Sequence, residues 1–195
     1  MKKIILASGS PRRRELLTQI GISFEVVKAE GEEKITTDDP EEAVKELAMQ
    51  KAQEVAGRVD ADVVIGADTV VAVDGEIMGK PKDPEDAVRM IHRIQGRDHE
   101  VLTGVAVILK KGEVETTINF AETTRVYVFP MTEEEIQAYV ASKEPMDKAG
   151  AYGIQGLFAA YVSGIEGDYN NVVGLPVGRL YQEVKAIADV DLRTL

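Results

Sequence analysis

The fold of this chain is decided near its start, by the stretch LASGSPRRRELL at residues 6–17. The apolar run Ile4–Ala7 leads into it and is typical of a short buried strand. Ser10 suits the N-cap of a following helix, and Pro11 suits its first turn. The helix has an apolar face formed by Leu16, Leu17 and Ile20. A strand joined by a short turn to a helix is the first unit of an α/β fold.

Three consecutive arginines, Arg12, Arg13 and Arg14, lie in the first turn of this predicted helix. Positive charge is unfavourable there, because the helix dipole already places partial positive charge at the N-terminus. The chain has a formal net charge of −11, so the arginines need a local anionic partner. Free backbone N–H groups and the hydroxyls of Ser8 and Ser10 would suit a phosphate. The sequence therefore predicts an anion site at this turn.

The composition restricts the class of protein. The chain has 195 residues, of which 44% are hydrophobic and 29% charged, as in ordinary globular proteins. It has no cysteine, which excludes disulfides and thiolate metal sites and favours a cytoplasmic location. The acidic balance argues against nucleic-acid binding, and no apolar run approaches the roughly 20 residues of a membrane helix. We expect no nucleic-acid or membrane partner.

Strand and helix patterns alternate along the chain and predict an α/β fold with a largely continuous sheet. Strand patterns lie at residues 22–26, 63–65, 70–73, 76–78, 101–109 and 126–129. Helices are expected from Pro40 to about Val55, between Asp83 and Gly96, after the capping pair Thr132 and Glu135, and near the end, with Leu180, Tyr181, Val184 and Ile187 facing inward. No linker separates these elements, so residues 1–195 are expected to form a single domain.

Asp68 follows a buried strand pattern, in the stretch GADT at residues 66–69. Ligand chemistry gathers at strand ends in α/β folds, although aspartate also caps turns. Glu32 and Glu33 lie in the acid-rich segment 30–42, which is either a solvated face or the source of a second carboxylate. Asp68 with one of these glutamates is a candidate metal site.

Such a metal would have hard oxygen ligands. The chain offers no cysteine, and its two histidines, His92 and His99, are expected on the surface. One falls on the polar side of its helix, and the other follows a turn. Carboxylate ligands favour Mg²⁺ or Mn²⁺ over Zn²⁺.

Three further polar residues each have two interpretations. Lys51 shares the apolar face of its helix and either extends along the edge of the core or enters a cleft to hold a phosphate. Lys80 precedes Pro81, which fixes an extended backbone, so it is either a positioned cation or an ordinary lysine. Gln155, in a glycine-rich segment, can recognise the polar edge of a base or satisfy local backbone groups.

Taken in order, these stretches resemble the Maf family of nucleoside triphosphate pyrophosphatases. The matching stretches are residues 6–17, Glu32-Glu33, Lys51 in QKA, GADTVV at 66–71, GKP at 79–81, Thr103-Gly104-Val105, EPMDKAGAYGIQG at 144–156 and GDYNNVVGLP at 167–176. The resemblance implies a mixed twisted α/β sheet with flanking helices in two lobes around a deep cleft, as in the inosine triphosphate pyrophosphatases. It implies hydrolysis of a nucleoside triphosphate to the monophosphate and pyrophosphate, assisted by a divalent metal.

By this resemblance the chain is similar to the branch that is specific for dTTP and UTP. Asp68 matches the proton acceptor of the family. Positions tied to base selection are matched by Arg12, Thr69 and Gln155. Substrate contacts are matched by Ser8, Arg13, Lys51 and Lys80. Glu33 matches a carboxylate near the metal, but Gly31 departs from the family pattern, so the choice between Glu32 and Glu33 stays open.

Other functions fit the same residues. The family is associated with septum formation, so a nucleotide-binding regulator with little turnover is the main alternative. A pyrophosphatase for inosine or xanthosine triphosphate is a second. A nucleotidyltransferase is a third, because it also combines an N-terminal phosphate loop with carboxylate-bound Mg²⁺. The resemblance is compatible with a homodimer.

Overall fold

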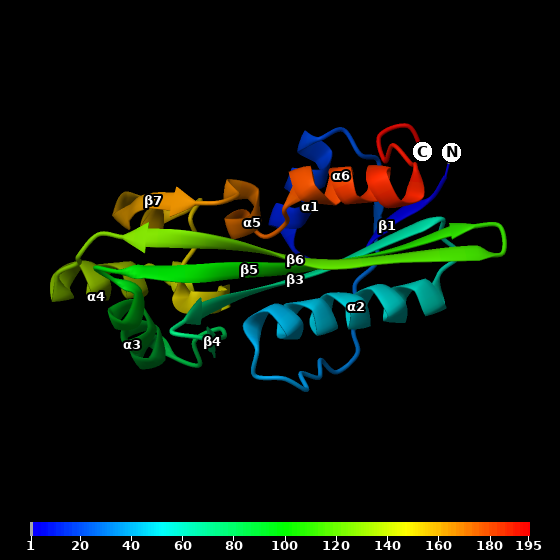
Figure 1. The fold of residues 1–195 in the computed structure, drawn as a ribbon. Helices are drawn as coiled ribbons and strands as arrows, with labels where there is room; N and C mark the ends of the chain where they lie inside the picture. The colour runs from blue at the N-terminus through cyan, green and yellow to red at the C-terminus, as the bar shows by residue number, and fades with distance from the viewer. Residues whose placement is uncertain (1) are drawn as a thin grey trace.

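A computed structural model describes residues 2–195, which are built around one mixed sheet (Figure 1). Its strand order is β2-β1-β3-β5-β6-β7, and β4 pairs with β3 outside that order. β1 runs parallel to β2 and β3, and the other pairs are antiparallel. The strands are β1 (Ile4–Leu6), β2 (Glu25–Val26), β3 (Val63–Val73), β4 (Glu76–Met78), β5 (Asp98–Lys111), β6 (Val114–Val128) and β7 (Val162–Glu166).

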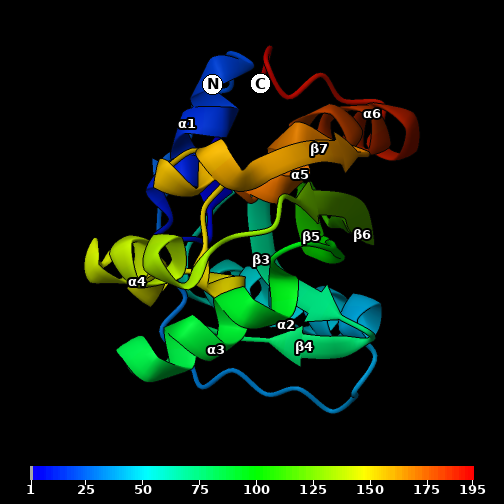
Figure 2. The same cartoon turned by 90° about the vertical axis from the view of Figure 1, so that its left-hand side faces the viewer.

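Helices cover both faces of this sheet. The α-helices are α1 (Pro11–Gln19), α2 (Pro40–Arg58), α3 (Pro84–Ile94), α4 (Glu133–Ala141), α5 (Tyr169–Val173) and α6 (Val177–Ala188). Short 3₁₀ helices are η1 (Glu144–Asp147), η2 (Ala149–Ala151) and η3 (Leu157–Tyr161). Figures 1 and 2 show α2 on one face, with α1 and α6 on the opposite face and α3 and α4 at the far end of the long strands. The predicted fold class, a mixed α/β sheet flanked by helices, is confirmed.

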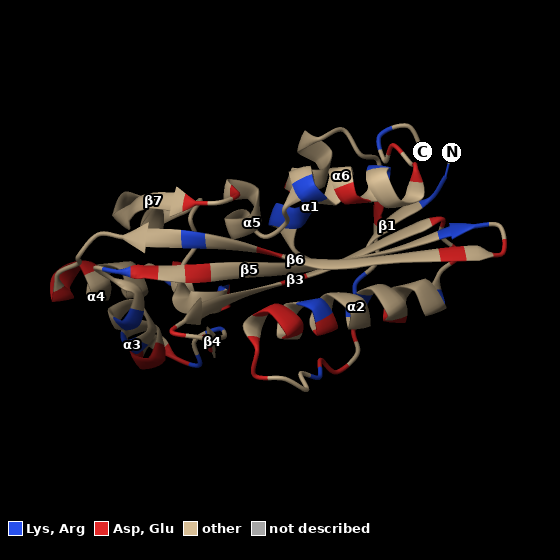
Figure 3. Cartoon of the chain, viewed as in Figure 1, with Lys and Arg blue, Asp and Glu red and all other residues tan. Residues whose placement is uncertain are grey.

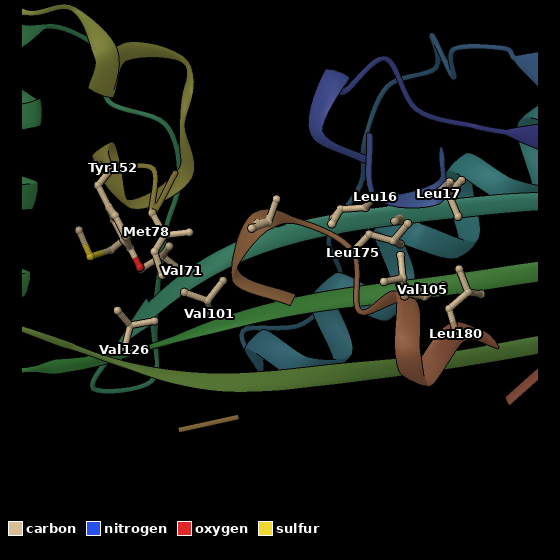
Figure 4. Close-up of a cluster of buried hydrophobic side chains, with 14 of the residues drawn as sticks. Leu16, Leu17, Val71, Met78, Val101, Val105, Val126, Tyr152, Leu175 and Leu180 are labelled. Atoms are coloured by element: carbon tan, nitrogen blue, oxygen red, sulfur yellow. The ribbon is translucent and has the colours of Figure 1, made fainter. Parts of the chain in front are cut away.

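The main core follows the long strands. Figure 4 shows its labelled side chains in two groups along the same strands. One group contains Leu16 and Leu17 of α1 with Leu180 of α6, and the other contains Val71 of β3 with Tyr152. The sheet therefore joins α1 to the glycine-rich segment around Tyr152.

Two expectations about strands are wrong. β3 does not stop near Ile65 but continues to Val73, so Asp68 lies in the middle of a strand. Glycine and aspartate are poor strand formers, yet the antiparallel pairing of Val63–Ala72 with β5 overrides that preference. The strand predicted at 22–26 keeps only Glu25–Val26 and lies at the edge of the sheet, where both residues are exposed.

The last helix is also less buried than its pattern indicates. Leu180 and Val184 are buried as expected, but Tyr181 is only half-buried and Ile187 is 54% exposed. Ser10 occupies the N-cap of α1, although its hydroxyl makes no capping hydrogen bond within the described part of the chain.

Glycines allow α2 to lie directly on the sheet. A Cβ atom at Gly66 would lie 2.3 Å from the carbonyl oxygen of Ala48, and one at Gly104 would lie 2.0 Å from the carbonyl oxygen of Val44. Both carbonyls belong to α2, so a side chain at either glycine would push the helix away from β3 and β5.

The expectation that His99 lies on the surface is wrong, whereas His92 is exposed as predicted. His99 is only 2% exposed on β5, and its Nε2 lies 2.6 Å from the hydroxyl of Tyr152. Burial lowers the pKa of His99 from 6.5 to about 4. The turn signal before His99 favoured an exposed position. The residue is buried because side chains from distant parts of the chain, including Tyr152, cover it.

Because α2 lies so close to the sheet, alanine at two different glycines should change the free energy of unfolding in different ways. Gly104→Ala should lower the free energy of unfolding by about 3 kcal/mol or more, because the new methyl group overlaps backbone atoms of α2. Gly57→Ala, within α2 and with open space around it, should leave stability unchanged or raise it by up to about 1 kcal/mol. Urea unfolding of both variants measures the difference, and similar stabilities would contradict the predicted packing.

The buried His99 predicts acid sensitivity. Between pH 6.5 and about 4 the unfolded chain binds a proton that the folded chain does not, so lowering the pH favours unfolding. This group alone should remove about 3 kcal/mol of stability between pH 7 and 4. In His99→Gln the loss of stability over that range should be smaller than in the wild type by this amount. Parallel losses in the two proteins would contradict the assignment.

Candidate active site

A cleft of about 710 Å³ lies between the start of α1, the middle of β3 and the segment 147–155. It brings together residues far apart in sequence. The predicted site residues that line it are Ser8, Arg12, Arg13, Glu33, Lys51, Asp68, Thr69, Lys80 and Gln155. Glu32 is exposed and is not among the lining residues, so it is Glu33 that faces the cleft.

Arg13 is a buried lining residue of this cleft and joins three parts of the chain. Its Nε donates to the carbonyl oxygen of Gly174 at 2.8 Å. Its Nη1 donates to the carbonyl oxygen of Ala67 at 2.8 Å and to Ser8 Oγ at 3.1 Å, and its Nη2 donates to Thr69 Oγ1 at 3.0 Å. One Nη2 hydrogen is left without an acceptor among residues 2–195. Arg13 thus mainly organises the site and has one donor for a ligand.

The three arginines of α1 differ in how far they are exposed to solvent. Arg13 is buried, Arg12 is half-buried and lines the cleft, and Arg14 is exposed and lies outside it. Burial lowers the pKa of Arg13, while the charge of Asp68 opposes that shift. The arginine run therefore supplies two cations to the cleft.

Lys51 enters the cleft from α2 and bridges two carboxylates. Its ammonium contacts Asp68 Oδ1 and lies 2.9 Å from Glu33 Oε1. The side chains of Lys51 and Asp68 are each only 16% exposed. Of the two interpretations of Lys51, the structure supports the one in which it points into the cleft.

The carboxylates form a partial ligand set for a metal ion. Within residues 2–195, no three His, Cys, Asp or Glu side chains gather as ligands. Asp68 and Glu33 nevertheless converge on one cation, the Lys51 ammonium. Hard divalent cations are commonly held by one or two carboxylates together with substrate phosphates and water, so this pair fits Mg²⁺ or Mn²⁺.

Several lining residues were missed by sequence reasoning. Lys148 has a side chain only 15% exposed, and its ammonium donates to Asp147 Oδ1 and to the carbonyl oxygen of Glu144, both at 2.7 Å. Its place at the start of the glycine-rich segment, residues 148–156, was the available signal. Lys28 lines the cleft beside Gly9, and nothing in its local sequence indicates that position.

The cleft carries positive charge in an acidic chain. Figure 3 shows acidic positions spread over loops and helices on both sides of the sheet. In the cleft, cations outnumber carboxylates: Arg12, Arg13, Lys28, Lys51, Lys80 and Lys148 against Glu33, Asp68 and Asp147. A local excess of cations of this kind concentrates anionic ligands.

Known proteins resemble this chain over nearly its full length. The family model described as Maf-like protein matches residues 3–187. A dTTP/UTP pyrophosphatase of Agathobacter rectalis is 53% identical, over 96% of this chain and 98% of the relative. Proteins of the same name from Lachnoclostridium phytofermentans and Bacillus cereus are 52% and 50% identical, over 95% and 98% of both chains.

No helix formed by residues 2–195 is long and apolar enough to cross a membrane. The match of the family model from residue 3 to residue 187, together with relatives at 50% identity or more, shows that the chain belongs to the Maf-like protein family.

Proposed function

We propose that this chain is a nucleoside triphosphate pyrophosphatase that hydrolyses dTTP and UTP to the monophosphate and pyrophosphate. The relatives that carry this name cover nearly the whole chain. The observation that carries the proposal is the pairing of Asp68 with Lys51 on the wall of a cationic cleft. A cleft that only bound an anion would have no need of a half-buried carboxylate on its wall.

The triphosphate is the part of the substrate that the cations suit. Lys80, Arg12 and the remaining Nη2 hydrogen of Arg13 can donate to phosphate oxygens, and Ser8 lies beside them. These groups come from α1 and from the segment after β4, so a bound triphosphate would span the cleft. We propose that they hold the phosphates in line with the attacking water.

Asp68 is proposed as the proton acceptor. A water molecule forms a bond from its oxygen to the α-phosphorus, and its proton passes to an Asp68 oxygen. The bond between the α-phosphorus and the bridging oxygen breaks, and pyrophosphate leaves with the electron pair. Cations around the leaving group stabilise its negative charge. The middle of β3 holds Asp68 in place during this step.

We further propose that Asp68 and Glu33 hold a Mg²⁺ or Mn²⁺ ion with oxygens of the substrate. Bound there, the ion would neutralise phosphate charge. Lys51 would then exchange its carboxylate partners for phosphate oxygens. Two carboxylates that already share one cation support this arrangement.

Selection of the base is proposed for Arg12, Thr69 and Gln155, which the cleft brings together. Thr69 is fixed by its bonds with Arg13 and with Thr103 Oγ1, at 2.9 Å. We propose that residues 1–195 work as one domain, because the sheet joins the walls of the cleft. A cytoplasmic location stays a prediction from the absence of cysteine, and a homodimer stays a prediction from the resemblance.

Replacing Asp68 tests the proposed chemistry. Asp68→Asn should lower pyrophosphate release from UTP and dTTP by about 10² or more, the scale expected for a lost general base, while nucleotide binding is largely kept. Asp60→Asn, at an exposed position outside the cleft, is the control. The assay uses Mg²⁺ and a panel of triphosphates.

Three results would change the proposal. Near-normal turnover by Asp68→Asn would exclude the residue as proton acceptor. Nucleotide binding without pyrophosphate release by the wild type would favour a regulator linked to septum formation. Release only from inosine or xanthosine triphosphate would overturn the choice of base.

Replacing Lys51 tests the shared cation. Without nucleotide, Lys51→Met should bind Mn²⁺ about tenfold more tightly than the wild type, because the ammonium no longer neutralises Asp68 and Glu33. Its turnover should fall. Lys80→Met, which removes a lysine with no ion pair to either carboxylate in the described structure, should not gain Mn²⁺ affinity. Electron paramagnetic resonance of free Mn²⁺ measures both, and equal affinities for wild type and Lys51→Met would contradict the arrangement.

A further inference from the structure

The glycine-rich segment, residues 148–156, is docked against several elements of the cleft. A Cβ atom at Gly150 would lie 2.6 Å from Val71 Cγ2, two residues beyond Thr69 on β3. The backbone N–H of Gly150 donates to the carbonyl oxygen of Gly79 at 3.0 Å, next to Lys80. The segment is therefore positioned by the same strand and hairpin that carry proposed substrate contacts.

The backbone of this segment is strained. Ala151 has φ of +60°, in the left-handed region that residues with a Cβ atom rarely adopt. This conformation costs about 1–2 kcal/mol, and alanine has no polar side chain to offset it. It persists only where neighbouring contacts hold it.

Tyr152 supplies these contacts. It is buried, its ring lies 4.7 Å from the ring of Phe158, and it meets His99 edge to face at 5.1 Å. Its hydroxyl shares the 2.6 Å hydrogen bond with His99 Nε2. This bond ties the segment to β5, the strand that pairs with β3 opposite Asp68.

His99 is a costly residue at this position. Its Nδ1 is buried and has no hydrogen-bond partner among the described residues. An unpaired buried polar atom destabilises the fold by about 1–3 kcal/mol, so apolar packing alone does not explain a histidine at this position. The hydrogen bond between His99 and the Tyr152 hydroxyl is the favourable contact that offsets this cost.

The segment leads from Tyr152 directly to the proposed base-selecting residues. A Cβ atom at Gly153 would lie 2.8 Å from Lys148 Cε and 3.7 Å from Arg12 Nη1. Gln155 follows two residues later and lines the cleft. Only two residues separate it from Tyr152, so its place depends on where Tyr152 is held.

We propose that the hydrogen bond between His99 and Tyr152 positions the glycine-rich segment and thereby sets the base selectivity of the enzyme. This inference rests on the proposed function, in which Arg12 and Gln155 select the base. His99 and Tyr152 are positioning residues, because they act through the segment. Without the bond, the segment shifts and Gln155 no longer distinguishes bases by a fixed geometry.

Tyr152→Phe tests this, because it removes only the hydroxyl and keeps the ring against Phe158. The KM for UTP should rise about tenfold, with kcat changed by less than about threefold. The ratio of kcat/KM for UTP over that for GTP should fall about tenfold. Tyr161→Phe is the matched control, since Tyr161 packs on the same Phe158 ring, at 5.6 Å, but does not line the cleft. It should keep the wild-type ratio.

Variants of His99 separate positioning from stability. His99→Leu removes the unpaired Nδ1 but leaves the buried Tyr152 hydroxyl without its partner, so its stability at pH 7 should stay close to that of the wild type, while it loses selectivity as Tyr152→Phe does. His99→Gln, which keeps an acceptor for the Tyr152 hydroxyl, should recover part of the selectivity. If Tyr152→Phe and His99→Leu both keep the wild-type ratio, the proposal is overturned.

Hydrogen exchange without nucleotide gives a readout independent of turnover. The amides of residues 148–156 should exchange faster in Tyr152→Phe than in the wild type or in Tyr161→Phe. Unchanged exchange would overturn the positioning contact even if UTP is hydrolysed. Absence of hydrolysis by the wild type would instead overturn the proposed function, while faster exchange in Tyr152→Phe would still support the contact.

Discussion

The contact between α2 and the sheet is the constraint on which the site depends. The helix backbone rests on β3 and β5 at Gly66 and Gly104, where no side chain separates them. This approach brings Lys51, on α2, to Asp68, on β3. The distance between the proposed proton acceptor and its cation is therefore set by backbone packing. A rigid spacing of this kind would keep the proposed catalytic pair together when the ligand leaves.

A second constraint is the buried charge of Arg13. A guanidinium away from water must be hydrogen-bonded, and its acceptors come from Ser8, β3 and Gly174. Removing any of these partners would leave a charged donor unpaired. The start of α1, the central strand and the turn before α6 are thus held in one relative position, and the fold and the anion site share that requirement.

Local signals allowed the sequence to predict much of the fold. The capping box of Thr132, the hairpin turn after β3 and nine polar or charged residues that line the cleft were predicted from short stretches or from the family resemblance. The errors concern residues whose surroundings are built by distant parts of the chain. Asp68 stays within a strand because β5 pairs with it, and His99 is buried because Tyr152 and its neighbours cover it. Periodicity carries no information on such contacts, which is also why Lys28 was missed.

The cleft has one wall on the continuous strand β3 and another on irregular segments, and the two walls differ in how readily they tolerate substitutions. Asp68 and Thr69 lie on a strand hydrogen-bonded to β5 from Val63 to Ala72, so their backbone opens only when the sheet itself opens. Glu33 and Gln155 lie on irregular segments, where substitutions disturb fewer backbone hydrogen bonds. Substitutions at Gln155 can therefore alter the proposed base selection while the backbone around Asp68, the proposed proton acceptor, stays unaltered. The sheet restricts change around Asp68 and Thr69, whereas the irregular segments tolerate it.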